Sequence, residues 1–144
     1  MAITQAVVSL FKQDLLAGVH NFSSSGGDTF KLALYTSSAT LDSSTTVYTT
    51  SDEVVGPGYT AGGGTLVNAT GSPFLSGTTA FIDFDDYTWT TATISAAGAL
   101  IYNSSKSNKA VAVLSFGGTF SSTAGDFTIS FPAATSSTAV LILS

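Results

Sequence analysis

The sequence contains no cysteine and no arginine, and it has few charged residues of any kind. Without cysteine the chain can form neither disulfide bonds nor thiolate metal sites. Its four lysines are outnumbered by nine acidic residues, which gives a net charge of −5. Because nucleic-acid binding depends on clustered cations that neutralise phosphates, this charge balance argues against a nucleic-acid partner.

Long hydrophobic runs are also missing, and even the longest apolar runs are short, such as Ala139–Leu143. A membrane-spanning helix needs about 20 consecutive apolar residues, so the sequence predicts no membrane span. No basic region precedes the first apolar stretch, which argues against a secretory signal. Disorder is equally disfavoured, because 44% of the residues are hydrophobic and the mean hydropathy is +0.38.

Serine and threonine are abundant, with 44 of the 144 residues. Threonine suits a pleated strand, so this composition favours an all-β fold whose outward faces carry hydroxyl groups. Uncharged hydroxyl surfaces repel one another little, which suits a protein that packs against neighbouring molecules. The length fits a single domain, and we expect residues 1–144 to form one.

The N-terminal segment differs from the rest of the chain. Apolar side chains recur there at helical spacing, at Val7, Phe11, Leu15 and Val19. The pattern predicts an amphipathic helix over about residues 5–19, with Thr4 as the N-cap and an end at Gly18 or Asn21. Its apolar stripe is expected either to cover the protein's own β core or to dock on another subunit.

The remaining sequence reads as short strands separated by glycine, asparagine, serine or proline. Strands are predicted at TFKLALYTS, VYTT, TLVNATG, TTAFIDFDD, YTWTTATISA, GALIYN, AVAVLSFGG, DFTISF and TAVLILS. The alternation breaks near Trp89, which indicates a bulge, and the last strand is expected to be buried. The connections in the second half are too short for βαβ crossovers. The predicted fold is therefore an antiparallel β-sandwich, jelly-roll-like, with one N-terminal helix.

Titratable groups that could carry chemistry are few. His20, the single histidine, lies near the predicted helix end, where it is expected to cap the helix or face its dipole. Asp83, Asp85 and Asp86 are weak candidates for Ca²⁺ binding or acid–base chemistry, but the glycine and glutamate of an EF-hand are missing. A polar strand face followed by a turn at Asp85-Asp86 is the favoured explanation. No catalytic residue, cofactor or metal is assigned.

A long irregular segment, YTTSDEVVGPGYTAGGG, separates two predicted strands. It lacks the lysine of a phosphate-binding P-loop. Because long loops in compact domains are often functional, we interpret it as a contact element, with a solvated loop at the end of the sandwich as the alternative. Its glycines would allow close approach to another surface, its proline would restrict its freedom, and its second tyrosine would serve as an anchor. The predicted interface residues are Asp52, Glu53, Pro57, Tyr59, Gly62 and Gly63, together with Phe11 and Leu15 of the helix.

Several stretches resemble a family of small virion-associated proteins of tailed bacteriophages. They are GGDTFKLALYTSSATL, YTTSDEVVGPGYTAGGGTL, TATISAAGALIYN, KAVAVLSFGG and AGDFTISFP, and they cover roughly residues 2–132. The most specific stretch runs from Asp52-Glu53-Val54 to Gly62-Gly63. The resemblance implies a non-enzymatic structural protein located on the virion.

The expected partners are copies of the protein itself and other virion proteins, such as major capsid, neck or tail proteins. A capsid decoration or head-fibre role is favoured over a neck or tail role. One alternative is a carbohydrate-binding module for host recognition, which would require an exposed aromatic platform near Tyr87, Trp89 and Tyr102. A third alternative is a small hydrolase that uses Asp83 and Asp85.

Overall fold

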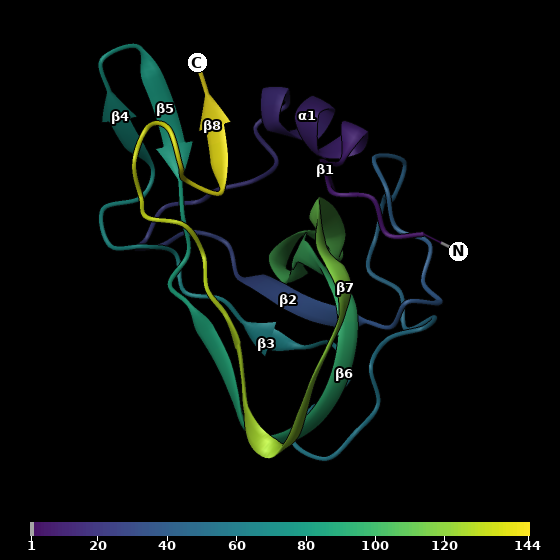
Figure 1. Ribbon diagram of the computed structural model, residues 1–144. Helices are drawn as coiled ribbons and strands as arrows, with labels where there is room; N and C mark the ends of the chain where they lie inside the picture. The colour runs from purple at the N-terminus through teal and green to yellow at the C-terminus, as the bar shows by residue number, and fades with distance from the viewer. Residues whose placement is uncertain (1) are drawn as a thin grey trace.

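The computed structural model describes residues 2–144, which form two antiparallel sheets and one short N-terminal helix (Figure 1). The elements are β1 (Ala6–Val7), α1 (Ser9–Leu16), β2 (Phe30–Tyr35), β3 (Gly64–Thr65), β4 (Phe74–Ser76), β5 (Thr79–Ile82), β6 (Tyr87–Asn103), a 3₁₀ turn (Ser104–Lys106), β7 (Lys109–Ile129) and β8 (Leu141–Leu143). The five-stranded main sheet has the order β1-β7-β6-β2-β3, and the small sheet has the order β4-β5-β8. The predicted fold class, an antiparallel β-sandwich with one N-terminal helix, is confirmed.

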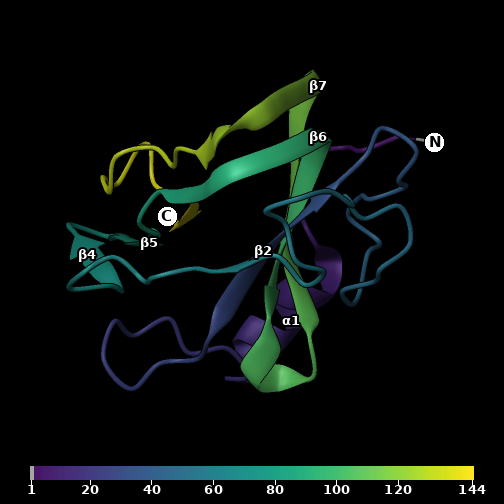
Figure 2. The ribbon, with the colours of Figure 1, turned by 90° about the horizontal axis from the view of Figure 1, so that it is seen from below.

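The β6–β7 hairpin forms the centre of the fold. Its strands contain 17 and 21 residues, whereas the sequence suggested several shorter strands in this region. Backbone irregularities bend the strands without ending their pairing, as at Thr91 and Ala124, whose φ angles are 48° and 47°. The register shifts between Trp89 and Ala92, which confirms the bulge expected there. Figures 1 and 2 show that the hairpin bends along its length.

The N-terminal helix is shorter than predicted. Residues 5–19 were expected to be helical, but Ala6 and Val7 pair with β7 instead. This pairing holds the segment extended, so tertiary contacts override the local helical pattern. Thr4 is not the N-cap, because the helix begins at Ser9 and Val8 occupies the N-cap position. In the part of the chain that the structure describes, the α-helix has 8 residues, which is too short to span a membrane.

The predicted helix end at Gly18 is confirmed. Gly18 has a φ of 73°, in the left-handed region that glycine adopts without a steric penalty. Its N–H donates to the carbonyl of Leu15 at 3.1 Å, and the N–H of Val19 donates to the carbonyl of Asp14 at 2.9 Å. These two bonds form a Schellman motif and satisfy the last carbonyls of the helix.

Several predicted strands are shorter than expected. VYTT contributes a single backbone bridge between Val47 and Lys109, and TLVNATG contributes only Thr65 of β3 and a bridge between Asn68 and Phe84. The strand predicted in TTAFIDFDD ends at Ile82. The C-terminal strand β8 lies at the edge of the small sheet, and Leu143 is 60% exposed rather than buried. Leu141, at the start of β8, is partly buried against the core, so the exposure increases toward the end of the strand.

A chain of aromatic rings connects α1 with the β core. Phe11 packs on Phe22 with ring centroids 5.9 Å apart, and Phe22 stacks on Phe30 at 4.3 Å. Phe84 continues the chain 5.7 Å from Phe30. Leu15 is partly buried against the same core. The helix therefore covers the protein's own core, and the side chain of Phe11 is not available to another subunit.

Candidate functional site

Residues 48–64, which we call the edge loop, cover the outer edge of β2. The N–H of Val54 donates to the carbonyl of Leu34 at 2.9 Å. At the other end of the loop, Gly64 pairs with Leu32. The loop thus satisfies backbone groups that an uncovered edge strand would expose. These two contacts anchor the loop on β2, and the residues between them include exposed positions such as Val55, which is 96% exposed.

The carboxylate of Glu53 lies inside the edge loop, and this residue is only 7% exposed. It accepts hydrogen bonds from the hydroxyl groups of Tyr48 at 2.6 Å and Tyr59 at 2.7 Å, and from the N–H of Gly62 at 2.8 Å. Tyr59 in turn accepts a bond from the N–H of Leu34 at 2.9 Å. Among the described residues no cation pairs with Glu53, so these neutral donors stabilise the buried charge.

Two further tyrosines complete the cluster around Glu53. Tyr102 donates to the carbonyl of Gly62 at 2.6 Å and stacks on Tyr48 with ring centroids 4.6 Å apart. Tyr35 donates to the carbonyl of Thr49 at 2.6 Å. Burial raises the pKa of Tyr102 to about 12, and the negative charge of Glu53 adds to this shift.

The same causes raise the pKa of three other tyrosines. Burial is the main cause for Tyr35, Tyr48 and Tyr59, and the nearby charge of Glu53 contributes to each pKa shift. Hydrogen bonds from Tyr48 and Tyr59 to Glu53 hold both phenols in their protonated form. The cluster is therefore built for neutral phenols around one ionised carboxylate.

The glycines of the edge loop do allow close backbone approach, as predicted, but the surface that they approach is the protein's own sheet. Gly63 has a φ of 77°, and a Cβ there would lie 1.8 Å from the carbonyl oxygen of Leu32. A Cβ on Gly56 would lie 2.2 Å from the carbonyl oxygen of Thr93. The carbonyl of Pro57 also accepts a bond from the N–H of Thr93 at 2.8 Å. The loop is thus clamped against both β2 and β6.

The predicted interface residues of the edge loop differ in exposure, and Gly63 is partly buried. Glu53, Tyr59 and Gly62 are buried inside the loop, so the predicted anchor Tyr59 points into the protein rather than toward a partner. Asp52 and Pro57 lie on the outer surface. The structure shows an internal polar cluster where the sequence suggested an intermolecular contact.

The three clustered aspartates differ in burial and in hydrogen-bond partners. Asp83 is buried and its Oδ1 accepts from the N–H of Phe84 at 2.9 Å. Burial raises the pKa of Asp83, and the nearby carboxylates of Asp85 and Asp86 raise this pKa further. The Oδ1 of Asp86 accepts from the N–H of Phe131 at 2.7 Å, and Asp85 is exposed. The described residues contain no group of three or more such side chains placed to hold a metal ion.

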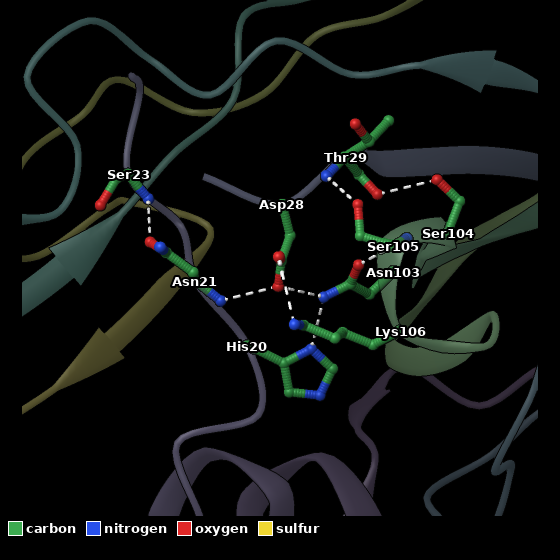
Figure 3. Close-up of polar contacts among 9 residues, drawn as sticks. All are labelled: His20, Asn21, Ser23, Asp28, Thr29, Asn103, Ser104, Ser105 and Lys106. Atoms are coloured by element: carbon green, nitrogen blue, oxygen red, sulfur yellow. Dashed lines mark hydrogen bonds and ion pairs between the residues drawn. The ribbon is translucent and has the colours of Figure 1, made fainter. Parts of the chain in front are cut away.

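His20 does not cap the helix, because the last helical carbonyls are already bonded to Gly18 and Val19. It is buried against the tip of the β6–β7 hairpin, where Asn103 contacts both His20 and Asp28 (Figure 3). Sequence reasoning missed this group because Asn103 lies 75 residues from Asp28 along the chain. No local pattern connects the two residues.

The aromatic residues proposed as a carbohydrate platform are packed inside the protein. Trp89 and Tyr102 are buried, and Tyr87 is partly buried. The ring of Tyr87 lies edge-on to Trp89 with centroids 4.6 Å apart, and Tyr59 lies 5.8 Å from Trp89. Since these rings contact one another and the core, they do not form an exposed platform.

An exposed row of apolar side chains crosses the small sheet. Leu75 pairs with Ala80, and Ala80 pairs with Leu143, so the three side chains project from the same side of the sheet. Leu75 is 76% exposed and Leu143 is 60% exposed. The strands β4, β5 and β8 contain no charged residue. We call these three residues the apolar row.

No family model, no curated protein and no solved structure matches this chain.

Alanine substitutions at two glycines should separate the two reasons for which the chain uses glycine. Gly26 has a φ of 76° and open space around it, so Gly26→Ala should cost about 1 kcal/mol of unfolding free energy for the left-handed backbone. Gly63→Ala should cost about 1–3 kcal/mol more, because the new Cβ meets the backbone of β2. Urea denaturation measures both values. Equal losses would show that the edge loop is not clamped on β2.

Alkaline titration should show that the tyrosine cluster resists ionisation while the protein is folded. Because the folded pKa values of Tyr35, Tyr48, Tyr59 and Tyr102 lie above the ordinary value of 10.0, stability is unaffected below that pH and decreases as the pH rises above it. Most tyrosinate absorbance should therefore appear together with the loss of circular dichroism. Gradual ionisation of these tyrosines in the folded protein would contradict this account.

Proposed function

We propose that this protein is a structural protein that assembles through contacts between its own copies. We further propose that it works as an accessory protein of a tailed-phage virion, in a capsid decoration or head-fibre role. The observation that carries the first part is the apolar row on an uncharged sheet. The second part is supported by the resemblance of the sequence to small phage virion proteins.

The apolar row suits contact with a second copy of the same sheet. Fully burying a leucine side chain contributes about 1.5–3 kcal/mol, so exposed Leu75 and Leu143 are a source of association free energy. Copies related by twofold symmetry bring the same patch together, and strands without charges do not repel each other there. The small sheet also has β4 and β8 at its edges, where another strand can add.

A virion setting makes such contacts effective even when each is weak. A shell presents many copies of one protein at fixed spacing, so several small interfaces act together. A surface rich in hydroxyl groups and poor in charge tolerates close packing of neighbours. The same reasoning applies to a neck or tail position, which differs only in the partner. The carbohydrate-binding alternative lacks the exposed aromatic platform that it requires.

Charge substitutions in the apolar row should abolish self-association without unfolding the protein. The double variant Leu75→Lys and Leu143→Lys places cations in the proposed contact, and both positions are exposed enough to accept them. Light scattering after size exclusion should show an oligomer for the natural protein and a monomer for the variant, with similar melting temperatures. The matched control is Leu16→Lys on α1, where the leucine is 92% exposed, and it should remain oligomeric.

The same variants test the virion role when they are compared for incorporation into tailed phage particles. The natural protein and the Leu16→Lys control should co-sediment with purified particles, and the double variant should be depleted. A natural protein that stays monomeric at high concentration would contradict the self-assembly proposal. A natural protein that oligomerises but is absent from particles would contradict the virion role alone.

A further inference from the structure

His20 sits in a buried position that joins three parts of the chain. Its side chain is 0% exposed. The ring packs 4.9 Å from Phe11 of α1 and 6.4 Å from both Phe22 and Phe30, measured between ring centroids. On its polar side it contacts Asn103, the last residue of β6 (Figure 3). The histidine thus connects the helix and the chain that follows it to the tip of the hairpin.

The orientation of the Asn103 side chain is fixed by two neighbours other than His20. Its Nδ2 donates to the Oδ2 of Asp28 at 2.8 Å, and an ionised carboxylate can only accept. Its Oδ1 accepts from the N–H of Ser105 at 3.0 Å, and a backbone N–H can only donate. Nδ2 is therefore also the atom that faces the Nδ1 of His20, at 2.9 Å. It follows that Nδ1 is the acceptor and that the neutral ring carries its proton on Nε2.

The other ring nitrogen has no hydrogen-bond partner. Nε2 lies 3.8 Å from the Oδ2 of Asp14, which is too far for a hydrogen bond, and both atoms are buried without a hydrogen bond. Lys109 of β7 lies 3.4 Å from the same oxygen of Asp14. Lys106, in the turn after β6, lies 3.8 Å from the Oδ1 of Asp28. Each nearby acid is therefore already paired with a lysine.

These charged groups act on the histidine in opposite directions. Burial is the largest effect and lowers the pKa of His20, and the positive charge of Lys109 lowers it further. The carboxylates of Asp14 and Asp28 raise the pKa but do not cancel the effect of burial. The neutral ring is therefore the form that the folded protein favours.

We propose that His20 is an acid-sensitive latch, and that protonation of its Nδ1 detaches residues 14–28 from the tip of the β6–β7 hairpin. When Nδ1 of His20 is protonated, its N–H faces the Nδ2–H of Asn103, so two donors meet and the hydrogen bond is lost. Asn103 cannot correct this by turning its amide over, since its oxygen would then face the carboxylate of Asp28 and its nitrogen would face the N–H of Ser105. The network is compatible with the neutral ring that carries its proton on Nε2, and it opens when Nδ1 is protonated as well.

The direction of the pH dependence follows from the lowered pKa. The unfolded or opened segment binds a proton with the ordinary pKa of 6.5, and the closed segment binds it less readily. The closed state therefore has its full stability above this pH and loses stability as the pH falls below it. Between 6.5 and the folded pKa, the opening equilibrium should rise up to about tenfold for each pH unit.

Nuclear magnetic resonance can test the latch without ambiguity, because the protein has a single histidine. Long-range nitrogen–proton spectra near neutral pH should show the ring protonated on Nε2. Amide hydrogen exchange, corrected for intrinsic rates, should show faster opening of residues 14–28 as the pH falls below 6.5. The amides of β2 should not follow this trend, because the strand is paired on both edges.

The matched variant is His20→Asn, whose amide oxygen can accept from Asn103 but does not titrate in this range. The variant should lose the pH dependence of opening. A natural protein whose ring carries its proton on Nδ1 near neutral pH would overturn the proposal, as would exchange in residues 14–28 that is independent of pH. The same pH dependence in the variant would also overturn it. These measurements concern a single chain, so their outcome does not depend on the proposed self-assembly.

Discussion

The buried carboxylate of Glu53 is the interaction on which the arrangement of the edge loop depends. Removing an ion from water costs several kcal/mol unless the protein replaces its hydration. Here the replacement comes from Tyr48, Tyr59 and Gly62, all of which belong to the same loop. The loop therefore folds around its own acid. The hydroxyl of Tyr59 also accepts a hydrogen bond from the N–H of Leu34 in β2, which connects the loop to the sheet. In this way one side chain fixes both the interior of the loop and its position on the sheet.

The same principle appears at Asn103, which directly follows Tyr102 of this cluster at the end of β6. Asn103 has no exposed surface and bonds to His20, Asp28 and Ser105. Only 9% of the residues are charged, and at both centres hydroxyl, amide or backbone donors bond to a buried polar side chain. Such networks specify one arrangement because each lost partner leaves a costly buried group. The two centres differ in one respect: the network at Glu53 is complete, whereas Nε2 of His20 has no partner.

Local signals in the sequence were sufficient where the structure is locally determined. The strand β2, the helix end at Gly18 and the bulge near Trp89 follow from patterns within a few residues. Local signals failed where a contact with a residue far away in the sequence determines the structure. Ala6 and Val7 become a strand because β7 offers backbone bonds more than a hundred residues away. The glycines of the edge loop illustrate both cases, because their close approach was predictable and its target was not. Tyr59 was read as an anchor for a partner, and only the position of Leu34 shows that it is internal.

The most direct measurement is a double-mutant cycle between Glu53→Gln and Tyr59→Phe, read as free energies of unfolding in urea. If the charged hydrogen bond organises the edge loop, the two changes should be coupled by about 1.5–3 kcal/mol. Additivity within about 0.5 kcal/mol would contradict the central role of Glu53.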